Sequence, residues 1–149
     1  MNTPFHILVV DDFPPWRNFE ISALREHIES CTICEACDGS EAVQFAVDLQ
    51  PDLITLDIGL PKLNGIEAAR QIREKCPDTK ILFVTSHRAL DLAEAAFAAG
   101  GDGYFVKSDG KAEFVRAVDT VRQNCRFISR TLAPEELGSL VSRFLHPIS

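Results

Sequence analysis

The sequence predicts an α/β fold: a five-stranded parallel, doubly wound sheet in the strand order 2-1-3-4-5, with helices on both faces. Short apolar runs alternate five times with segments whose apolar residues recur every three or four positions. The connections between them are short, which favours right-handed crossovers and parallel strands. At 149 residues, the chain is long enough for one domain with a substantial core.

The elements of the first half follow from local signals. A strand covered on both faces is an uninterrupted apolar run, and a surface helix repeats its apolar side chains at three- and four-residue steps. Pro14 and Pro15 suit the first turn of a helix. The expected elements are a strand at 5–10, a helix at 14–28, a strand at 31–37, a helix at 40–49 and a strand at 53–56.

In the second half, glycine and proline mark the breaks. Gly59 and Pro61 open a loop after the central strand, and Gly100-Gly101 end an alanine-rich helix. We expect that helix to pack loosely and to be a moving part. The expected elements are a helix at 66–76, a strand at 81–84, a helix at 90–99, a strand at 104–106 and a helix at 114–122.

The composition narrows the function classes. A net charge of −7 argues against unaided binding of nucleic acid, which requires a basic face. No segment approaches the roughly 18 consecutive apolar residues of a membrane span, and no export signal is visible. We therefore expect a cytoplasmic protein that contacts neither a membrane nor nucleic acid directly.

The five cysteines are expected to be free thiols, because their number is odd and no secretory signal accompanies them. Cys31, Cys34 and Cys37 have a spacing that resembles part of an iron–sulfur ligand set. Side chains alternate between the faces of a strand, so Cys34 would point away from the other two. We expect no metal cluster there.

Polar residues follow the carboxyl ends of four predicted strands: Asp11-Asp12, Asp57, Thr85 and Lys107. Strands 1 and 3 flank the switch point of this strand order, where ligands bind in such sheets. Three neighbouring carboxylates repel one another unless a cation joins them, and oxygen ligands suit Mg²⁺ or Mn²⁺. With an ammonium and a hydroxyl nearby, these are the groups that phosphoryl transfer requires. Asp57 is central and would be the nucleophile, forming an acyl phosphate.

Over residues 6–124 the chain resembles the response-regulator receiver domain of two-component signalling. Five blocks carry the resemblance, in the right order and spacing: residues 9–12, 56–61, 64–65, 84–86 and 103–107. It implies a flavodoxin-like fold, with the receiver domain at residues 1–127. It also implies a phosphoacceptor signalling domain rather than an enzyme, with Mg²⁺-dependent self-phosphorylation and self-dephosphorylation chemistry.

The resemblance assigns the phosphoacceptor and the metal ligands. Asp57 would take its phosphoryl group from a sensor histidine kinase or a phosphotransfer protein. Asp12 and Asp57 would bind Mg²⁺ directly, with the backbone carbonyl of Gly59 as the third protein ligand. Asp11 would act through a water molecule.

The resemblance also assigns the switch. Lys107 would pair with the phosphoryl group, Thr85 would move toward it, and Tyr104 would swing inward behind Thr85. The fourth helix, fifth strand and fifth helix would form the moving surface and one candidate face for a homodimer. His87 either positions water and tunes hydrolysis of the phosphoryl group, or is simply solvated.

One departure from the family pattern is Ser108, which follows Lys107 where most members have proline after a cis bond. A cis bond without proline costs about 3–4 kcal/mol, so the Lys107–Ser108 bond is expected to be trans. Lys107-Ser108-Asp109 is nevertheless similar to the subclass that usually carries a LuxR-type helix-turn-helix domain. We expect no such domain within these 149 residues.

Residues 128–149 are expected to form a C-terminal extension with one amphipathic helix after Pro134. Apolar residues recur there at helical spacing: Leu137, Leu140, Val141, Phe144 and Leu145. That stripe either folds back on its own domain or pairs with a second copy or a partner.

The preferred function is a receiver that accepts a phosphoryl group on Asp57 and switches protein–protein contacts in a phosphorelay. The alternative is the receiver part of a transcription regulator whose DNA-binding domain is missing from this chain. Aspartate-nucleophile phosphatases place a second Asp where this chain has Gly59. A dinucleotide-binding domain requires a glycine-rich turn after the first strand, and residues 11–15 lack one.

Overall fold

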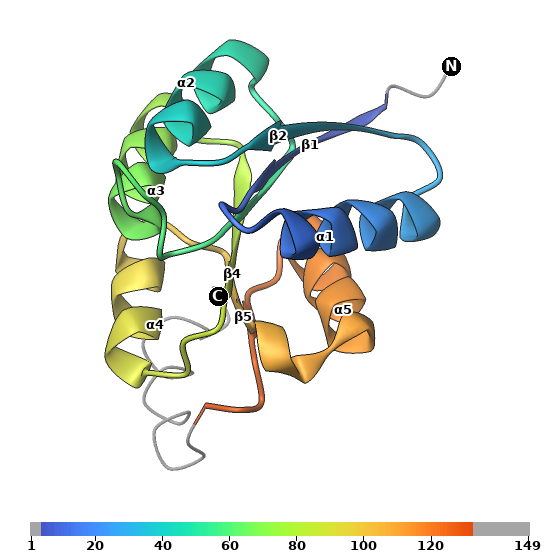
Figure 1. Ribbon diagram of the computed structural model, residues 1–149, viewed down its shortest axis with the longest axis vertical. Helices are drawn as coiled ribbons and strands as arrows, with labels where there is room; N and C mark the ends of the chain where they lie inside the picture. The colour runs from blue at the N-terminus through green and yellow to red at the C-terminus, as the bar shows by residue number, and fades with distance from the viewer. Residues whose placement is uncertain (1–3, 133–149) are drawn as a thin grey trace.

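The computed structural model describes residues 4–132. These residues form one parallel sheet between two layers of helices (Figure 1). The strands are β1 (Phe5–Val10), β2 (Cys31–Ala36), β3 (Leu53–Leu56), β4 (Lys80–Thr85), β5 (Gly103–Val106) and β6 (Phe127–Ile128). The helices are α1 (Pro14–His27), α2 (Gly39–Leu49), α3 (Gly65–Lys75), α4 (Leu90–Ala98) and α5 (Lys111–Arg122), with a 3-10 turn, η1, at Lys107–Asp109.

The strand order is β2-β1-β3-β4-β5-β6, so the predicted fold class and the order of its first five strands are confirmed. Figure 1 shows α2, α3 and α4 on one face of the sheet and α1 and α5 on the other. A separate apolar cluster lies under each layer. Both faces of the central strands are therefore buried, as their uninterrupted apolar runs predict.

The sixth strand was not predicted. It pairs with β5 through Gly103 and Phe127 and through Tyr104 and Ile128. The Ser129 hydroxyl oxygen then accepts a hydrogen bond from the Val106 amide at 2.7 Å. Two residues are too short to show a period, so no pattern in the sequence marked this strand. It spans the position at which the expected extension begins, and the helix expected after Pro134 lies outside the described residues.

The cysteines behave as predicted. All five are free thiols. Cys31 packs against the α1/α5 side of the sheet, whereas Cys34 packs against the α2/α3/α4 side. Cys37 lies just beyond the end of β2 rather than within it, which corrects the predicted range of that strand.

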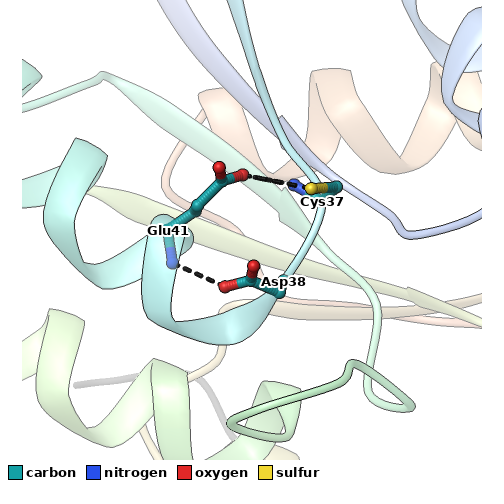
Figure 2. A group of neighbouring side chains, drawn as sticks. All are labelled: Cys37, Asp38 and Glu41. Carbon is teal, nitrogen blue, oxygen red and sulfur yellow. Dashed lines mark hydrogen bonds between the residues drawn. The ribbon is translucent and has the colours of Figure 1, made fainter.

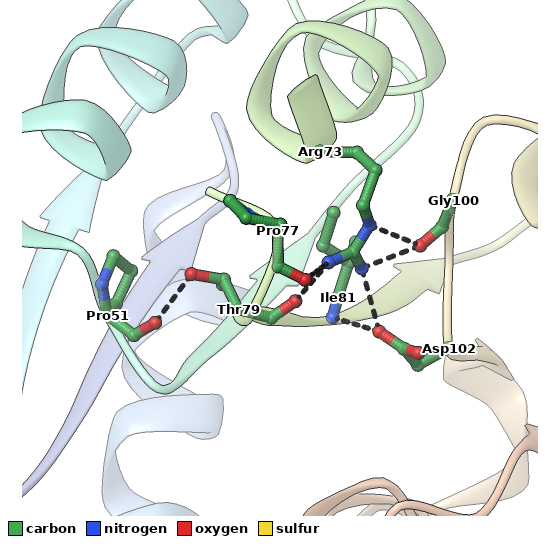
Figure 3. A network of polar contacts seen from close by, with 7 residues as sticks. All are labelled: Pro51, Arg73, Pro77, Thr79, Ile81, Gly100 and Asp102. Atoms are coloured by element: carbon green, nitrogen blue, oxygen red, sulfur yellow. Dashed lines mark hydrogen bonds and ion pairs between the residues drawn. The ribbon is translucent and has the colours of Figure 1, made fainter. Parts of the chain in front are cut away.

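Arg73 of α3 connects the two loops that lead into β4 and β5, at the edge of the sheet where those strands begin (Figure 3). Its guanidinium donates to the carbonyls of Pro77, Thr79 and Gly100, at 2.6–3.2 Å, and to the carboxylate of Asp102 at 2.9 Å. The same Asp102 oxygen accepts from the first buried amide of β4, that of Ile81, at 2.9 Å. One fork-shaped cation thereby satisfies carbonyls from two loops.

Within residues 4–132, no helix has the length and apolar character needed to cross a bilayer.

Candidate functional site

The carboxyl ends of β1, β3, β4 and β5 meet at one edge of the sheet. Val10 is paired with Leu56, which places Asp11 beside Asp57 in the next position along each strand. Leu56 is in turn paired with Phe83, so Thr85 at the end of β4 lies one residue beyond the level of Asp57. The register thus brings together the strand ends that the sequence singled out.

Three carboxylates gather there. One oxygen from each of Asp11, Asp12 and Asp57 lies within 4.8 Å of the other two. Asp11 is fully buried, Asp57 is largely buried with 13% of its side chain exposed, and Asp12 is exposed. The burial of Asp57, followed by the repulsion from Asp11, raises the pKa of the Asp57 carboxyl, and Lys107 only partly offsets this.

Lys107 neutralises part of this charge. Its Nζ lies 2.8 Å from Oδ2 of Asp11 and 3.5 Å from Oδ2 of Asp57, so the ammonium is bound mainly to Asp11. It also lies over the ring of Trp16, 5.2 Å from the centroid. Burial acts to lower the pKa of Lys107, but the hydrogen bond and the carboxylate charges prevail and raise it.

Backbone amides fix the two buried carboxylates. Oδ1 of Asp11 accepts from the Phe13 amide at 2.9 Å, and Oδ1 of Asp57 accepts from the Ile58 amide at 2.8 Å. In each case the other oxygen, Oδ2, faces Lys107. The loop after β3 is held close by α3, because a Cβ at Gly65 would collide with the carbonyl oxygen of Asp57. Both carboxylates are therefore oriented before any ligand binds.

Thr85 and Tyr104 both bind the backbone of His87. The Thr85 hydroxyl accepts from the His87 amide at 3.3 Å, and the Tyr104 hydroxyl donates to the His87 carbonyl at 2.8 Å. Thr85 and Tyr104 are fully buried, whereas His87 is exposed. Burial raises the pKa of Tyr104, so its hydroxyl keeps its proton and remains a donor. The two predicted switch residues are thus joined through the loop between β4 and α4.

The donor set fits a hard divalent cation. Every side chain in the three-carboxylate group offers oxygen, which Mg²⁺ prefers, and Asp12 is exposed at the entrance. Gly59 is exposed two residues after Asp57, and a Cβ there would meet nothing within 4 Å. Among the described residues, every peptide bond is trans, including Lys107–Ser108, as expected from the serine.

A second group with metal-ligand side chains is explained by helix capping (Figure 2). Asp38 accepts from the Glu41 amide at 2.8 Å and caps the N-terminus of α2. The Glu41 carboxylate reaches back to the amide and thiol of Cys37, at 3.0 and 3.3 Å. The hydrogen bond that the Cys37 thiol donates to the Glu41 carboxylate raises the pKa of the thiol, which makes it a poorer metal ligand.

Sequence reasoning did not single out two buried polar side chains beside the site, Glu20 and Thr55. Glu20 lies four residues after Trp16 and four before Leu24, on the apolar face of the expected helix at 14–28. That spacing was the available signal, since residues four apart share a helix face. Glu20 is 1% exposed, and burial raises the pKa of its carboxyl to about 8.

Comparison with known families gives a match to the response regulator receiver domain over residues 7–119. Similar proteins include the transcriptional activator protein ExaE of Pseudomonas putida, which is 33% identical over 87% of this chain and 60% of its own length. The transcriptional regulatory protein LiaR of Bacillus subtilis is 31% identical over 94% and 64%. The chain spans less than two thirds of these curated relatives.

Solved structures with the same fold include a two-component response regulator of the LuxR family from Aurantimonas sp. SI85-9A1. It is 32% identical, covers 93% of this chain and 99% of its own, and has a TM-score of 0.84. The receiver domain of a sensor histidine kinase from Pseudomonas aeruginosa is 28% identical, covers 82% and 97%, and has a TM-score of 0.69. That structure contains a magnesium ion coordinated in its active-site cleft.

Proposed function

The chain belongs to the response regulator receiver family, and on that premise we propose that Asp57 accepts a phosphoryl group and thereby switches protein–protein contacts. One observation carries the proposal: the Asp57 carboxylate is fixed at a sheet edge between two further carboxylates and the ammonium of Lys107. The donor would be the phosphohistidine of a sensor histidine kinase or of a phosphotransfer protein.

In the transfer, an Asp57 oxygen forms the new bond to phosphorus as the bond from phosphorus to the donor imidazole nitrogen breaks. The nitrogen keeps that electron pair, and the product on this chain is an acyl phosphate. Asp57 Oδ1 is held by the Ile58 amide, so Oδ2, which faces Lys107 at 3.5 Å, would be the attacking atom. Lys107 would then neutralise a phosphoryl oxygen.

We propose that Asp12, Asp57 and the Gly59 carbonyl hold Mg²⁺, with Mn²⁺ as an alternative, and that Asp11 contributes through water. The metal would supply positive charge to the phosphoryl oxygens, which is the main requirement of this reaction. Asp11 is already committed to Lys107 and the Phe13 amide, which favours its indirect role. Asp12 is exposed and available.

The switch would run through the loop that Thr85 and Tyr104 share. A phosphoryl group on Asp57 would offer the Thr85 hydroxyl a charged acceptor, and the hydroxyl would then turn from the His87 amide. The loop that Tyr104 holds by the His87 carbonyl would rearrange with it. His87 would act through its backbone, and its exposed ring remains a candidate for tuning hydrolysis.

A second candidate function is the receiver part of a transcription regulator. ExaE and LiaR are named as transcriptional regulators, and the chain spans 60–64% of their length. In that case phosphorylation would control a DNA-binding domain or a homodimer through α4, β5 and α5. Phosphorylation of Asp57 is common to both functions.

The test is phosphorylation by acetyl phosphate with Mg²⁺, followed by intact-mass analysis. We expect wild type to gain one phosphoryl group and Asp57→Asn to gain none, because the nucleophilic carboxylate is gone. Asp78→Asn is the matched control, since Asp78 is exposed before β4 at the opposite sheet edge, and it should label like wild type. Equal labelling of wild type and Asp57→Asn would refute the proposal.

A further inference from the structure

Four buried side-chain polar atoms in residues 4–132 have no hydrogen-bond partner, and all belong to α1 and β3. They are Nε1 of Trp16, both carboxyl oxygens of Glu20 and the hydroxyl oxygen of Thr55. Leaving a buried polar group unpaired is unfavourable, so such groups are rare and need an explanation. Glu20 and Thr55 are each at most 1% exposed.

This polar group lies directly beneath the proposed phosphorylation site. Thr55 is two residues before Asp57 on β3 and is paired with Val9, which is two residues before Asp11. Residues two apart share a face of a strand, so Thr55 lies on the same side of the sheet as both carboxylates. Glu20 comes from the overlying α1, one turn after Trp16.

The charges that act on Glu20 come from each strand end around it. Burial has the largest effect and favours the neutral acid, and the charges of Asp11 and Asp57 act in the same direction. Lys107 opposes them, and so does the Thr55 hydroxyl, although it does not meet the geometry of a full hydrogen bond with Glu20. Lys107 in turn is stabilised as a cation by Asp11, Asp57 and Glu20.

We propose that Glu20 is a positioning residue for Lys107, whose ammonium exchanges Asp11 for the Glu20 carboxylate when a divalent cation binds Asp12 and Asp57 and, through water, Asp11. This inference rests on the proposed function. Before phosphorylation, it assigns Lys107 two buried partners: Asp11 while the cation is absent and Glu20 once the cation is bound. Ionisation of Glu20 would then offset half of the positive charge that the divalent cation brings to the site.

Electrostatics supplies the reason for the exchange. An ammonium and a divalent cation bound to the same carboxylates repel each other strongly in a site with little solvent. Lys107 is already in contact with the ring of Trp16, on the same helix face as Glu20. A carboxylate without a partner lies one helical turn further on, and pairing with a cation would satisfy it.

The exchange moves one proton from Glu20 to solvent. Lys107 remains an ammonium throughout, and the Glu20 carboxyl group gives up its proton to solvent as Lys107 arrives. Because Glu20 holds that proton near neutral pH before the exchange, binding of the cation should release roughly one proton per chain. The ammonium would at the same time change its position over the indole ring.

Both consequences can be measured with Mg²⁺ alone as the probe, at pH 7. Trp16 is the only tryptophan of the chain, so its fluorescence reports the position of Lys107. Calorimetry in two buffers of different ionisation enthalpy counts the protons released. The variants are Glu20→Gln, which keeps the shape of the side chain, and Glu26→Gln, an exposed glutamate on the same helix, as the control.

We expect wild type and Glu26→Gln to release a proton and to change their Trp16 fluorescence on binding Mg²⁺. Glu20→Gln should bind Mg²⁺ without releasing a proton and with at most half the fluorescence change. Equal proton release by wild type and Glu20→Gln would overturn this inference alone. Failure of wild type to bind Mg²⁺ would overturn the proposed function and the inference with it.

If Glu20→Gln does not fold, proton release by the wild-type protein still tests the exchange of partners. Mg²⁺ binding by wild type without proton release at pH 7 would overturn the exchange of partners. A proton count near one that falls as the pH is raised above 8 would support it, because Glu20 would then be ionised before the cation binds.

Discussion

The Tyr104 hydroxyl donates to the His87 carbonyl at 2.8 Å, which fastens the fifth strand to the loop before α4. We expect Tyr104→Phe to lower the free energy of unfolding by about 1 kcal/mol, the usual net value of such a bond. Amide hydrogen exchange in residues 86–89 should become faster. Thr120→Val is the control, since it removes a hydroxyl-to-carbonyl bond of 2.7 Å on α5 and should leave that loop unchanged.

Asp12 is the exposed member of the three-carboxylate group. We expect Asp12→Ala to weaken Mg²⁺ binding on the order of tenfold or more, because a hard cation loses a charged oxygen ligand. Isothermal titration of Mg²⁺ into both proteins measures this. Asp78→Ala removes a comparable exposed carboxylate at the other sheet edge and should bind like wild type. Unchanged affinity in Asp12→Ala would contradict the ligand assignment.

In the absence of a divalent cation, Glu20 should lower the free energy of unfolding as the pH rises. Its pKa is about 8 in the folded chain and 4.5 in a solvated one, so both states hold the proton below pH 4.5. Between these values only the unfolded chain ionises, and each pH unit costs about 1.4 kcal/mol at most. Urea unfolding at pH 5, 6.5 and 8 should show Glu20→Gln gaining stability over wild type as pH rises. If the free energies of unfolding of wild type and Glu20→Gln changed with pH by the same amount, the raised pKa of Glu20 would be refuted.

Arg73 should contribute through the shape of its guanidinium rather than through its charge. We expect Arg73→Lys to lower the free energy of unfolding by about 2 kcal/mol or more, because a single ammonium cannot reach all the carbonyls that the fork satisfies. Arg70→Lys on the same helix affects only an exposed pair with Glu67 and should cost less than about 0.5 kcal/mol. Similar urea midpoints for the two variants would show that the network is dispensable.

The sequence was sufficient for the first five strands of the sheet and for the meeting of their carboxyl ends. β1 and β3 have the bounds that their apolar runs predict, and a parallel order places their last residues side by side. Asp11, Asp57 and Lys107 meet because parallel strands end at the same edge of the sheet, and the apolar pattern of each strand shows where that strand ends. The N-caps Asp38 and Asn64 likewise follow local rules.

What the sequence left out depends on contacts between distant residues. Arg73 binds Gly100 and Asp102, which are 27 and 29 positions away in the sequence. No local sequence pattern indicates that an arginine will bind partners so distant. Glu20 resembles any helix glutamate until the sheet beneath it is known. The partner of Tyr104 is a backbone carbonyl, which carries no side-chain signature.

The β6 segment has a mechanical consequence for whatever the chain carries beyond Leu132. Ser129, which follows β6, makes two hydrogen bonds to β5. Its amide donates to the Tyr104 carbonyl at 3.0 Å, and its hydroxyl accepts from the Val106 amide. A displacement of β5, which contains Tyr104 and leads into Lys107, would therefore also displace Ser129 at the end of the domain. If Asp57 is phosphorylated as we propose, a change at the acidic edge would reach Ser129 through the single strand β5.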